Sequence, residues 1–289
     1  MQSKSKNDDK INNPEVFYLK IKNKNGIKYE FQENKVLKYI KKYNVHGEFI
    51  VFSLIGKTQC GKSKLAEILT GVKHEIGELL QSETEGATIA YGGTIKDIYT
   101  RIHLEPPEYK NQDTDVFFID TEGIFDDSSQ ESMASLIIPL WVFSSKIVAF
   151  FDPQPDVSLN CFLSYYISFI VLNEKGKSED HFHDKIIVRI RDFPPEKVKE
   201  DVEYYANLFE KKSDVAKHFN NESLYPIYAP GGPYNQKKQC HEPKFNKYFL
   251  DQIFFSFLNS NTRQDQIVYC SPEIFVENVR TVTNLPFEN

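Results

Sequence analysis

The sequence predicts an α/β fold: a doubly wound, mainly parallel sheet with helices on both faces. Three near-continuous apolar runs support this prediction, at 116–119, 147–151 and 186–190. Strands without an apolar-polar alternation are typical of a parallel sheet that is buried on both faces. Amphipathic stretches suited to crossover helices lie between or after these runs, at 131–143, 159–172 and 196–211.

The N-terminal part predicts a tail and then a hairpin. Residues 1–13 are charged and amide-rich without periodicity, so we expect a flexible tail, followed by one domain over residues 14–289. Alternating segments over 16–31 predict a hairpin, and the apolar spacing over 36–40 predicts a helix after it.

The C-terminal part predicts two more helices. An aromatic stretch at 245–258 has near-helical spacing and is expected to pack on one face of the sheet. A final helix is expected to begin after Ser271, with Pro272 at its first position and Glu273 in its first turn. Loops are predicted at 105–113, 152–157, 174–184 and 229–243.

The composition excludes several classes of protein. A net charge of -6 and a pI near 5.7 argue against a nucleic-acid-binding surface or a polybasic membrane contact. The four cysteines are far apart and form no CxxC pair, so neither a zinc site nor a disulfide framework is indicated. The N-terminus does not resemble a signal peptide, and no apolar window approaches about eighteen residues. A cytoplasmic protein without an intrinsic membrane segment is expected.

The segment GKTQCGKS is a full match to the phosphate-binding loop pattern GxxxxGK[ST]. Glycines let successive backbone N–H groups turn toward an anion, Lys62 reaches the β and γ phosphates, and Ser63 supplies an oxygen to Mg²⁺. A plain glycine-rich turn is disfavoured, because an apolar strand pattern precedes the loop and a helical pattern follows it. The residues predicted to contact nucleotide are Gly56, Lys57, Thr58, Gln59, Cys60, Gly61, Lys62 and Ser63.

A second motif, DTEG, follows the apolar run at 116–119 and fits the pattern DxxG. It lies at the carboxyl end of a strand, where ligands of open α/β folds bind. Asp120 is predicted to hold Mg²⁺ through water, and the backbone N–H of Gly123 to meet a γ-phosphate. An aspartate before a turn is common, so the motif gains its weight from the phosphate loop that precedes it.

Between the two motifs lies a mostly polar segment, LLQSETEGAT. A loop that responds to nucleotide needs a threonine whose hydroxyl reaches Mg²⁺, and Thr84 is the candidate. An ordinary surface turn is the alternative, because Ser82, Thr84 and Thr88 all suit local bonds from side chain to backbone. Composition alone leaves both possibilities open.

The segments GKTQCGKS, QSETEG, FIDTEG and VRIRDF, in this order, resemble the GTPase domain of the guanylate-binding protein and atlastin family, large GTPases related to dynamin. The resemblance spans roughly 48–192. It implies a P-loop NTPase fold of the large-GTPase type, with GTP, GDP and Mg²⁺ as ligands. It also implies hydrolysis of GTP and a nucleotide-dependent homodimer. The catalytic residues that it implies are Lys62, Ser82, Thr84 and Glu122, with Ser82 and Glu122 organising water.

The resemblance further assigns guanine recognition to Arg191 and Asp192, at the end of the strand pattern IIVRI. An aspartate can accept hydrogen bonds from N1–H and the exocyclic amine of guanine, and an arginine plane can lie along the base. A surface ion pair that ends a strand is the alternative.

One position departs from the family. Its members usually carry an arginine finger two residues before the second glycine of the loop, where this chain has Gln59. Without that charge, hydrolysis is expected to be slow. A nucleotide-sensing switch with little turnover, or an ATP-dependent P-loop enzyme, are the alternatives. The chain has five arginines, of which Arg101 is the first candidate for a finger supplied in trans. His181 and His183 raise a metal site as an option, but a solvated turn is favoured.

Overall fold

The computed structural model describes residues 13–23, 26–45, 47–58, 60–73, 86–106, 108, 111–123, 130–151, 186–190, 234–235, 240–241, 247, 250–251, 253–254 and 267–284. Seven strands form one sheet: β1 (Glu15–Asn23), β2 (Gly26–Phe31), β3 (Phe49–Gly56), β4 (Ala87–Thr94), β5 (Asp115–Thr121), β6 (Lys146–Phe151) and β7 (Ile186–Ile190). The helices are α1 (Glu33–Lys42), α2 (Lys62–Thr70), α3 (Ile95–Arg101), α4 (Gln130–Phe143) and α9 (Pro272–Thr283).

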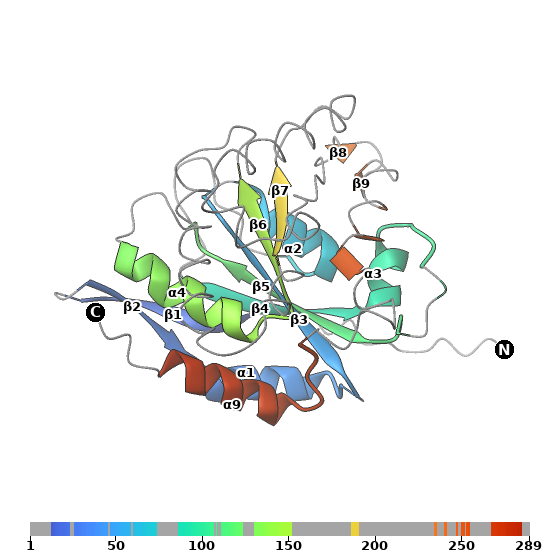
Figure 1. Cartoon of the computed structure of the whole chain (residues 1–289). Coiled ribbons are helices and arrows are strands. Elements are labelled where there is room, and N and C mark those ends of the chain that lie inside the picture. Colours follow the sequence, from blue (N-terminus) through green and yellow to red (C-terminus); the bar gives the residue numbers. More distant parts are fainter. Residues whose placement is uncertain are drawn as a thin grey trace, which may run out of the picture.

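The strands lie in the order β2-β1-β4-β5-β3-β6-β7 (Figure 1). Strands β5, β3, β6 and β7 are mutually parallel, whereas β4 is antiparallel to β5, β1 to β4, and β2 to β1. It follows that β1 points the same way as the parallel strands, and only β2 and β4 oppose them. The predicted mainly parallel α/β sheet is therefore confirmed, and so is the N-terminal hairpin.

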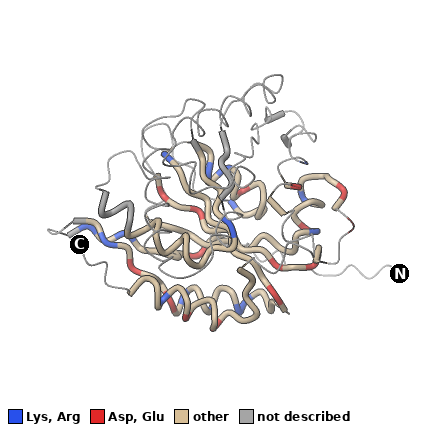
Figure 2. The backbone as a smooth tube through the Cα atoms, in the orientation of Figure 1, with Lys and Arg blue, Asp and Glu red and all other residues tan. Residues whose placement is uncertain are grey.

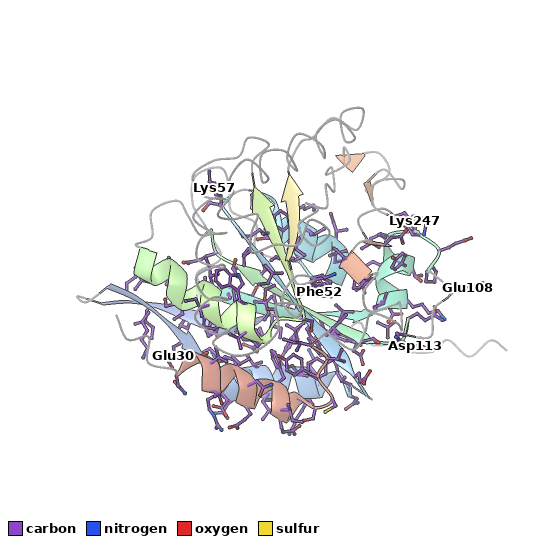
Figure 3. The ribbon with its side chains drawn as sticks, viewed as in Figure 1. Glu30, Phe52, Lys57, Glu108, Asp113 and Lys247 are labelled. Atoms are coloured by element: carbon purple, nitrogen blue, oxygen red, sulfur yellow. The ribbon has the colours of Figure 1, made fainter. Side chains whose placement is uncertain are left out.

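The central strand β3 is buried along its whole length, as its unbroken apolar sequence predicts. Its side chains alternate between two hydrophobic clusters, one on each face of the sheet. Phe49 stacks on Tyr269 on one face, with ring centroids 5.5 Å apart. Phe52 packs between Phe118 and Phe254 on the other face, and Figure 3 shows it in the interior of the molecule.

Helices cover both faces of the sheet, as predicted. The first cluster is closed by α1, α4 and α9, and the second by α2, α3 and the described residues of the 247–254 segment (Figure 1). In that segment Leu250, Ile253 and Phe254 are buried, which confirms the predicted packing of this part of the aromatic stretch. Because every face of the sheet has a helical layer, the strands are free to be apolar on both sides.

Helices α1 and α9 lie side by side and carry charges of both signs (Figure 2). Lys41 pairs with Glu273 at 2.6 Å and Arg280 with Glu33 at 3.4 Å. Exposed pairs of this kind contribute at most about 1 kcal/mol each, so the buried face of α9 provides most of its stabilisation. Helix α9 begins as predicted, because the Ser271 hydroxyl accepts a hydrogen bond from the Ile274 amide at 3.2 Å.

The last turn of α9 also closes over the first strand. The Tyr18 hydroxyl on β1 lies 2.8 Å from the Thr283 hydroxyl, a hydrogen bond between residues far apart in the chain. Burial raises the pKa of Tyr18 above its usual range, so this phenol stays protonated.

Two features of the described fold were not predicted. The first is α3, which begins with a capping box: the Asp97 amide donates to the Thr94 hydroxyl at 3.1 Å, and the Thr94 amide to the Asp97 carboxylate at 2.9 Å. The second is a two-residue ladder of β8 (Tyr234–Asn235) and β9 (Cys240–His241), which lies in the predicted loop 229–243. Two-residue strands are too short to leave a periodic pattern.

Several predictions lie outside the described residues. They are the tail over residues 1–12 and the helices at 159–172 and 196–211. Within the described parts of the chain, no helix combines the length and the apolar character needed to cross a membrane.

Candidate functional site

The two predicted motifs begin at the same edge of the sheet. Strands β3 and β5 are parallel and adjacent, with Leu54 opposite Asp120, so Gly56 and Glu122 follow as the next residues on the same side of each strand. The Thr121 hydroxyl donates to the Leu54 carbonyl at 2.8 Å and ties the two strand ends together. The phosphate-loop sequence and the DTEG sequence therefore meet, as parallel strands require.

The loop connects β3 to the N-terminus of α2. Gly61 occupies the N-cap position with a left-handed φ of +94°, which glycine adopts without steric cost, and no side chain caps the helix. The first amides of α2 are thus left to an anion, in the arrangement typical of phosphate sites. Lys57 lies at the tip where β3 ends (Figure 3).

Lys62 is held over the loop. The residue is 4% exposed, and its ammonium donates to the carbonyls of Gly56 at 3.0 Å and Lys57 at 2.6 Å. The Cys60 sulfur lies 3.7 Å from the same nitrogen. Carbonyl dipoles solvate this charge without neutralising it, so the ammonium can exchange them for phosphate oxygens.

Asp120 faces the loop from the end of β5 and is fully buried. Burial raises the pKa of this carboxyl from 3.8 to about 6, while the neighbouring Ser63 hydroxyl and the charge of Lys62 oppose the shift. The structure therefore brings together Ser63 and Asp120, the predicted metal residues of the two motifs. A hydroxyl and a carboxylate are hard oxygen donors, and Mg²⁺ sites that also contact phosphates need only one or two such groups. These residues fit Mg²⁺.

Gly123 lies directly against the phosphate loop. A Cβ atom added at this position would stand 2.6 Å from the Thr58 amide nitrogen and 1.8 Å from its hydroxyl oxygen. Any side chain at this position would force the two segments apart. The backbone of the DTEG motif is thus in contact with the phosphate loop.

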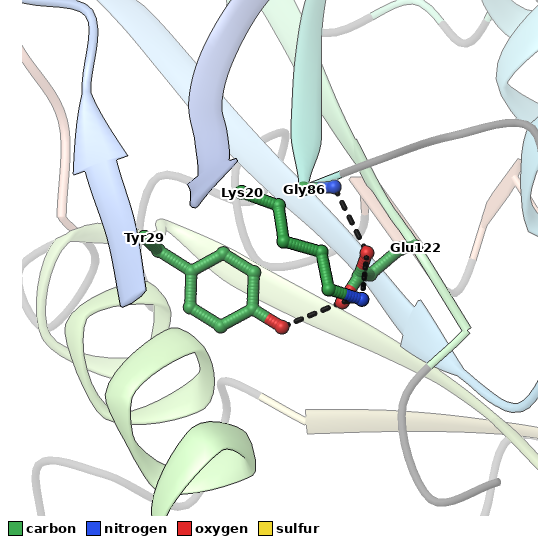
Figure 4. Close-up of polar contacts among 4 residues, drawn as sticks. All are labelled: Lys20, Tyr29, Gly86 and Glu122. Atoms are coloured by element: carbon green, nitrogen blue, oxygen red, sulfur yellow. Dashed lines mark hydrogen bonds and ion pairs between the residues drawn. The ribbon is translucent and has the colours of Figure 1, made fainter. Parts of the chain in front are cut away.

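Glu122 is engaged inside the protein (Figure 4). The residue is 3% exposed, and its carboxylate accepts from Lys20 at 2.8 and 2.9 Å, from the Tyr29 hydroxyl at 2.5 Å and from the Gly86 amide at 3.0 Å. The predicted role of Glu122 in ordering water stays a prediction. Sequence reasoning missed Lys20 and Tyr29, because hairpin residues gain this contact only through the order of strands in the sheet.

Arg101, the candidate for a finger in trans, serves its own chain. It lies beside the C-terminal end of α2, away from the loop, and its guanidinium donates to the Leu69 carbonyl. Burial lowers its pKa. Capping a helix C-terminus is the role that these contacts support.

The other predicted site residues lie outside the described residues. They are Gln59, Ser82, Thr84, Arg191 and Asp192, together with His181 and His183. Their assignments remain predictions.

No family model matches the chain, and no curated protein matches it either. Solved structures with a similar α/β arrangement include an Era variant of Aquifex aeolicus bound to GDP·AlF4⁻, at 17% identity and a TM-score of 0.37, covering 58% of this chain and 49% of that one. Era in complex with MgGDPNP and a segment of 16S ribosomal RNA is 18% identical, with a TM-score of 0.37 and coverage of 61% and 50%.

A bacterial selenocysteine-specific elongation factor, EF-Sec, is 15% identical, with a TM-score of 0.33 and coverage of 57% of this chain and 24% of that one. The chain thus spans half or less of the length of these proteins. Identities and superpositions this low do not establish a family for the chain. The strand order and the loop between β3 and α2 define the class: a P-loop α/β fold.

Proposed function

We propose that the chain is a Mg²⁺-dependent guanine-nucleotide-binding domain that hydrolyses GTP to GDP slowly. One observation carries the proposal: Lys62, the Ser63–Asp120 pair and the Gly123 backbone, from two separate motifs, converge at one edge of the sheet. A phosphate chain with its metal needs a cation, a hard-oxygen pair and backbone donors within reach of one another.

In this proposal the phosphate loop and the N-terminus of α2 bind the phosphates, and Lys62 transfers its hydrogen bonds from loop carbonyls to phosphate oxygens. Ser63 and Thr84 would hold Mg²⁺ directly and Asp120 would hold it through water. When bound, the metal neutralises charge that develops on the phosphate oxygens. Ser82 and Glu122 would position the attacking water.

Guanine recognition is assigned to Asp192, with Arg191 along the base. The support is chemical: a carboxylate can pair with two guanine donors that adenine does not present together. Nucleotide-dependent self-association and a cytoplasmic location belong to the proposal as well, and they rest on the resemblance and composition alone.

A nucleotide-sensing switch with little turnover is the second candidate, and a specific observation favours it. Gln59 brings no charge to the loop, and the two arginines whose side chains are described both serve other parts of the chain. Arg101 caps α2, and Arg280 pairs with Glu277 and Glu33. An arginine finger is worth about 10³–10⁵ in rate, so its absence separates binding from catalysis.

The test combines competition binding and single-turnover kinetics. GTP and GDP should bind with Mg²⁺ and displace each other, whereas ATP should compete poorly. Lys62→Ala should abolish both binding and hydrolysis, and Lys64→Ala is the matched control, because Lys64 is on the same helix, half-buried, and paired with Glu67 at 3.0 Å. Equal hydrolysis by wild type and Lys62→Ala would reject the enzyme and leave the switch. Equal affinity for ATP and GTP would reject the base assignment.

Mass measurement in the GDP, GTP-analogue and transition-state-analogue states tests the predicted homodimer. A doubling of mass only with the GTP analogue or the transition-state analogue is expected. A monomer in all three states would remove self-association from the proposal without affecting nucleotide binding.

A further inference from the structure

Glu122 joins two segments at the edge of the site that are distant in the chain. Its backbone amide donates to the Gly86 carbonyl at 2.8 Å, and its carboxylate accepts from the Gly86 amide at 3.0 Å. Gly86 comes directly before β4 and follows the polar segment that contains Thr84. Glu122 therefore holds both peptide groups of Gly86 against the DTEG motif through two hydrogen bonds, and we call this set of contacts the clamp.

The rest of the clamp comes from the N-terminal hairpin. Lys20 on β1 and Tyr29 on β2 are directly opposite each other in the hairpin register, and both reach the Glu122 carboxylate (Figure 4). Burial and the neighbouring carboxylate raise the pKa of Tyr29, so its hydroxyl keeps its proton and donates. A carboxylate this deeply buried is stable in one position only where such partners meet it.

The hairpin backbone also touches Gly86. A Cβ added to Gly86 would lie 2.2 Å from the Tyr18 carbonyl oxygen, so β1 limits where this residue can go. On the other side of Glu122, Gly123 lies against Thr58 of the phosphate loop. The order of contact is therefore hairpin, Glu122, Gly123, phosphate loop.

We propose that Lys20 and Tyr29 are positioning residues of the nucleotide site. By holding Glu122 they set the position of Gly123 against the phosphate loop, and with it the preference of the site for GTP over GDP. The described hydrogen bonds of their side chains go to Glu122 and not to the loop, so they act through Glu122. The inference rests on the proposed function, because it assumes that Gly123 meets a γ-phosphate.

The test measures the ratio of dissociation constants for GDP and a non-hydrolysable GTP analogue, both with Mg²⁺. Lys20→Met keeps the aliphatic stem and removes the charge, and Tyr29→Phe removes one hydroxyl. Each is expected to reduce the preference for the GTP analogue about tenfold, a coupling typical of linked sites, with GDP affinity nearly unchanged. A role in stability alone would lower the melting temperature and leave the ratio as it is.

Two matched controls are available. Lys22→Met makes the same change on the same strand, at an exposed position. Tyr91→Phe removes a hydroxyl that donates to the Asp115 carboxylate at 2.5 Å, at the opposite end of β5 from Glu122. Both controls should keep the wild-type ratio.

A double-mutant cycle tests the route through Glu122. In a Glu122→Gln background, Tyr29→Phe should change the ratio much less than in the wild type, because the group through which it acts is already altered. An unchanged ratio in Tyr29→Phe, with wild type binding both nucleotides, would overturn the inference and leave the proposed function intact. Failure of wild type to bind guanine nucleotides would overturn the proposed function itself. If Lys20→Met does not fold, Tyr29→Phe decides.

Discussion

The two ends of β5 each carry a carboxylate bonded by a tyrosine, and they differ in what surrounds that pair. At the amino end, Asp115 accepts from the Tyr91 hydroxyl and is partly buried. At the carboxyl end, Glu122 accepts from Tyr29, Lys20 and Gly86, and both neighbouring backbones make close approaches that exclude a side chain. A tyrosine–carboxylate hydrogen bond therefore occurs at both ends. At the carboxyl end it is part of a junction where four segments meet: β1, β2, the residue before β4, and the DTEG motif.

The largest expected difference between the ends is in stability when the carboxylate is neutralised. Glu122→Gln leaves the Lys20 ammonium without a counter-charge in a site that is 16% exposed, and we expect a loss of about 3 kcal/mol in the free energy of unfolding. Asp115→Asn removes the charge but keeps an oxygen that can accept from Tyr91, so it weakens one hydrogen bond and should cost at most about 1.5 kcal/mol. Denaturant unfolding of both variants measures the contrast, and equal losses would remove it.

Asp120→Asn separates stability from binding at the carboxyl end. Burial disfavours the charged form of Asp120, as its raised pKa indicates, so the amide should leave the nucleotide-free protein as stable or more stable. Binding of Mg²⁺ with nucleotide should weaken about 10- to 100-fold, as is typical when a metal-supporting group is lost. Thermal unfolding with and without Mg²⁺–GDP reports both effects. A variant that loses stability and keeps its affinity would show that Asp120 stabilises the fold and does not support the metal.

Gly123→Ala tests the close approach itself. The new methyl group would overlap Thr58, and relieving such a contact costs about 1–3 kcal/mol. We expect the affinity for a GTP analogue to fall about tenfold or more, at 1.4 kcal/mol per factor of ten. Titration of the variant with the analogue and with GDP checks this, and unchanged affinity for both would show that the contact is unrelated to the nucleotide.

The smallest expected effect is the loss of stability when either tyrosine hydroxyl is removed, and it should be equal at the two ends of β5. Tyr29→Phe and Tyr91→Phe each remove one hydroxyl that donates a hydrogen bond to a carboxylate. Both should therefore lower the free energy of unfolding by about 1.5 kcal/mol in the absence of nucleotide. Addition of Mg²⁺ and the GTP analogue should then stabilise Tyr91→Phe as much as the wild type and Tyr29→Phe less. Differential scanning fluorimetry over a range of analogue concentrations distinguishes the two variants.

Much of the fold around the two motifs could be predicted from the sequence, because patterns among residues close together in the chain specify it. The apolar run before Gly56, the glycines of the loop and the cap at Ser271 each act within a few residues, and the structure has β3, α2 and α9 at these places. The meeting of the two motifs followed from one rule about parallel strands. Helix α3 was not predicted, although Thr94 and Asp97 have the three-residue spacing of a capping box.

The contacts of Glu122 could not be predicted in the same way. They depend on β1 lying beside β4, an antiparallel pairing between distant segments that neither strand's own pattern specifies. Lys20 reads in the sequence as an ordinary solvent-facing residue of a hairpin, and only the strand order gives it a buried partner. Long-range pairing of this kind is where local sequence patterns carry no information.

The bond between Tyr18 and Thr283 has a consequence for how the chain is made. During synthesis β1 leaves the ribosome early and α9 late, although the two are bonded in the folded protein. The aromatic rings of Phe17 and Phe143 therefore lack their contact with Phe275 of α9 until the intervening segments have been made. Incomplete chains would expose these rings and be prone to association or chaperone capture. Pulse-chase folding of this protein should therefore show late protease resistance, acquired in one step after α9 leaves the exit tunnel.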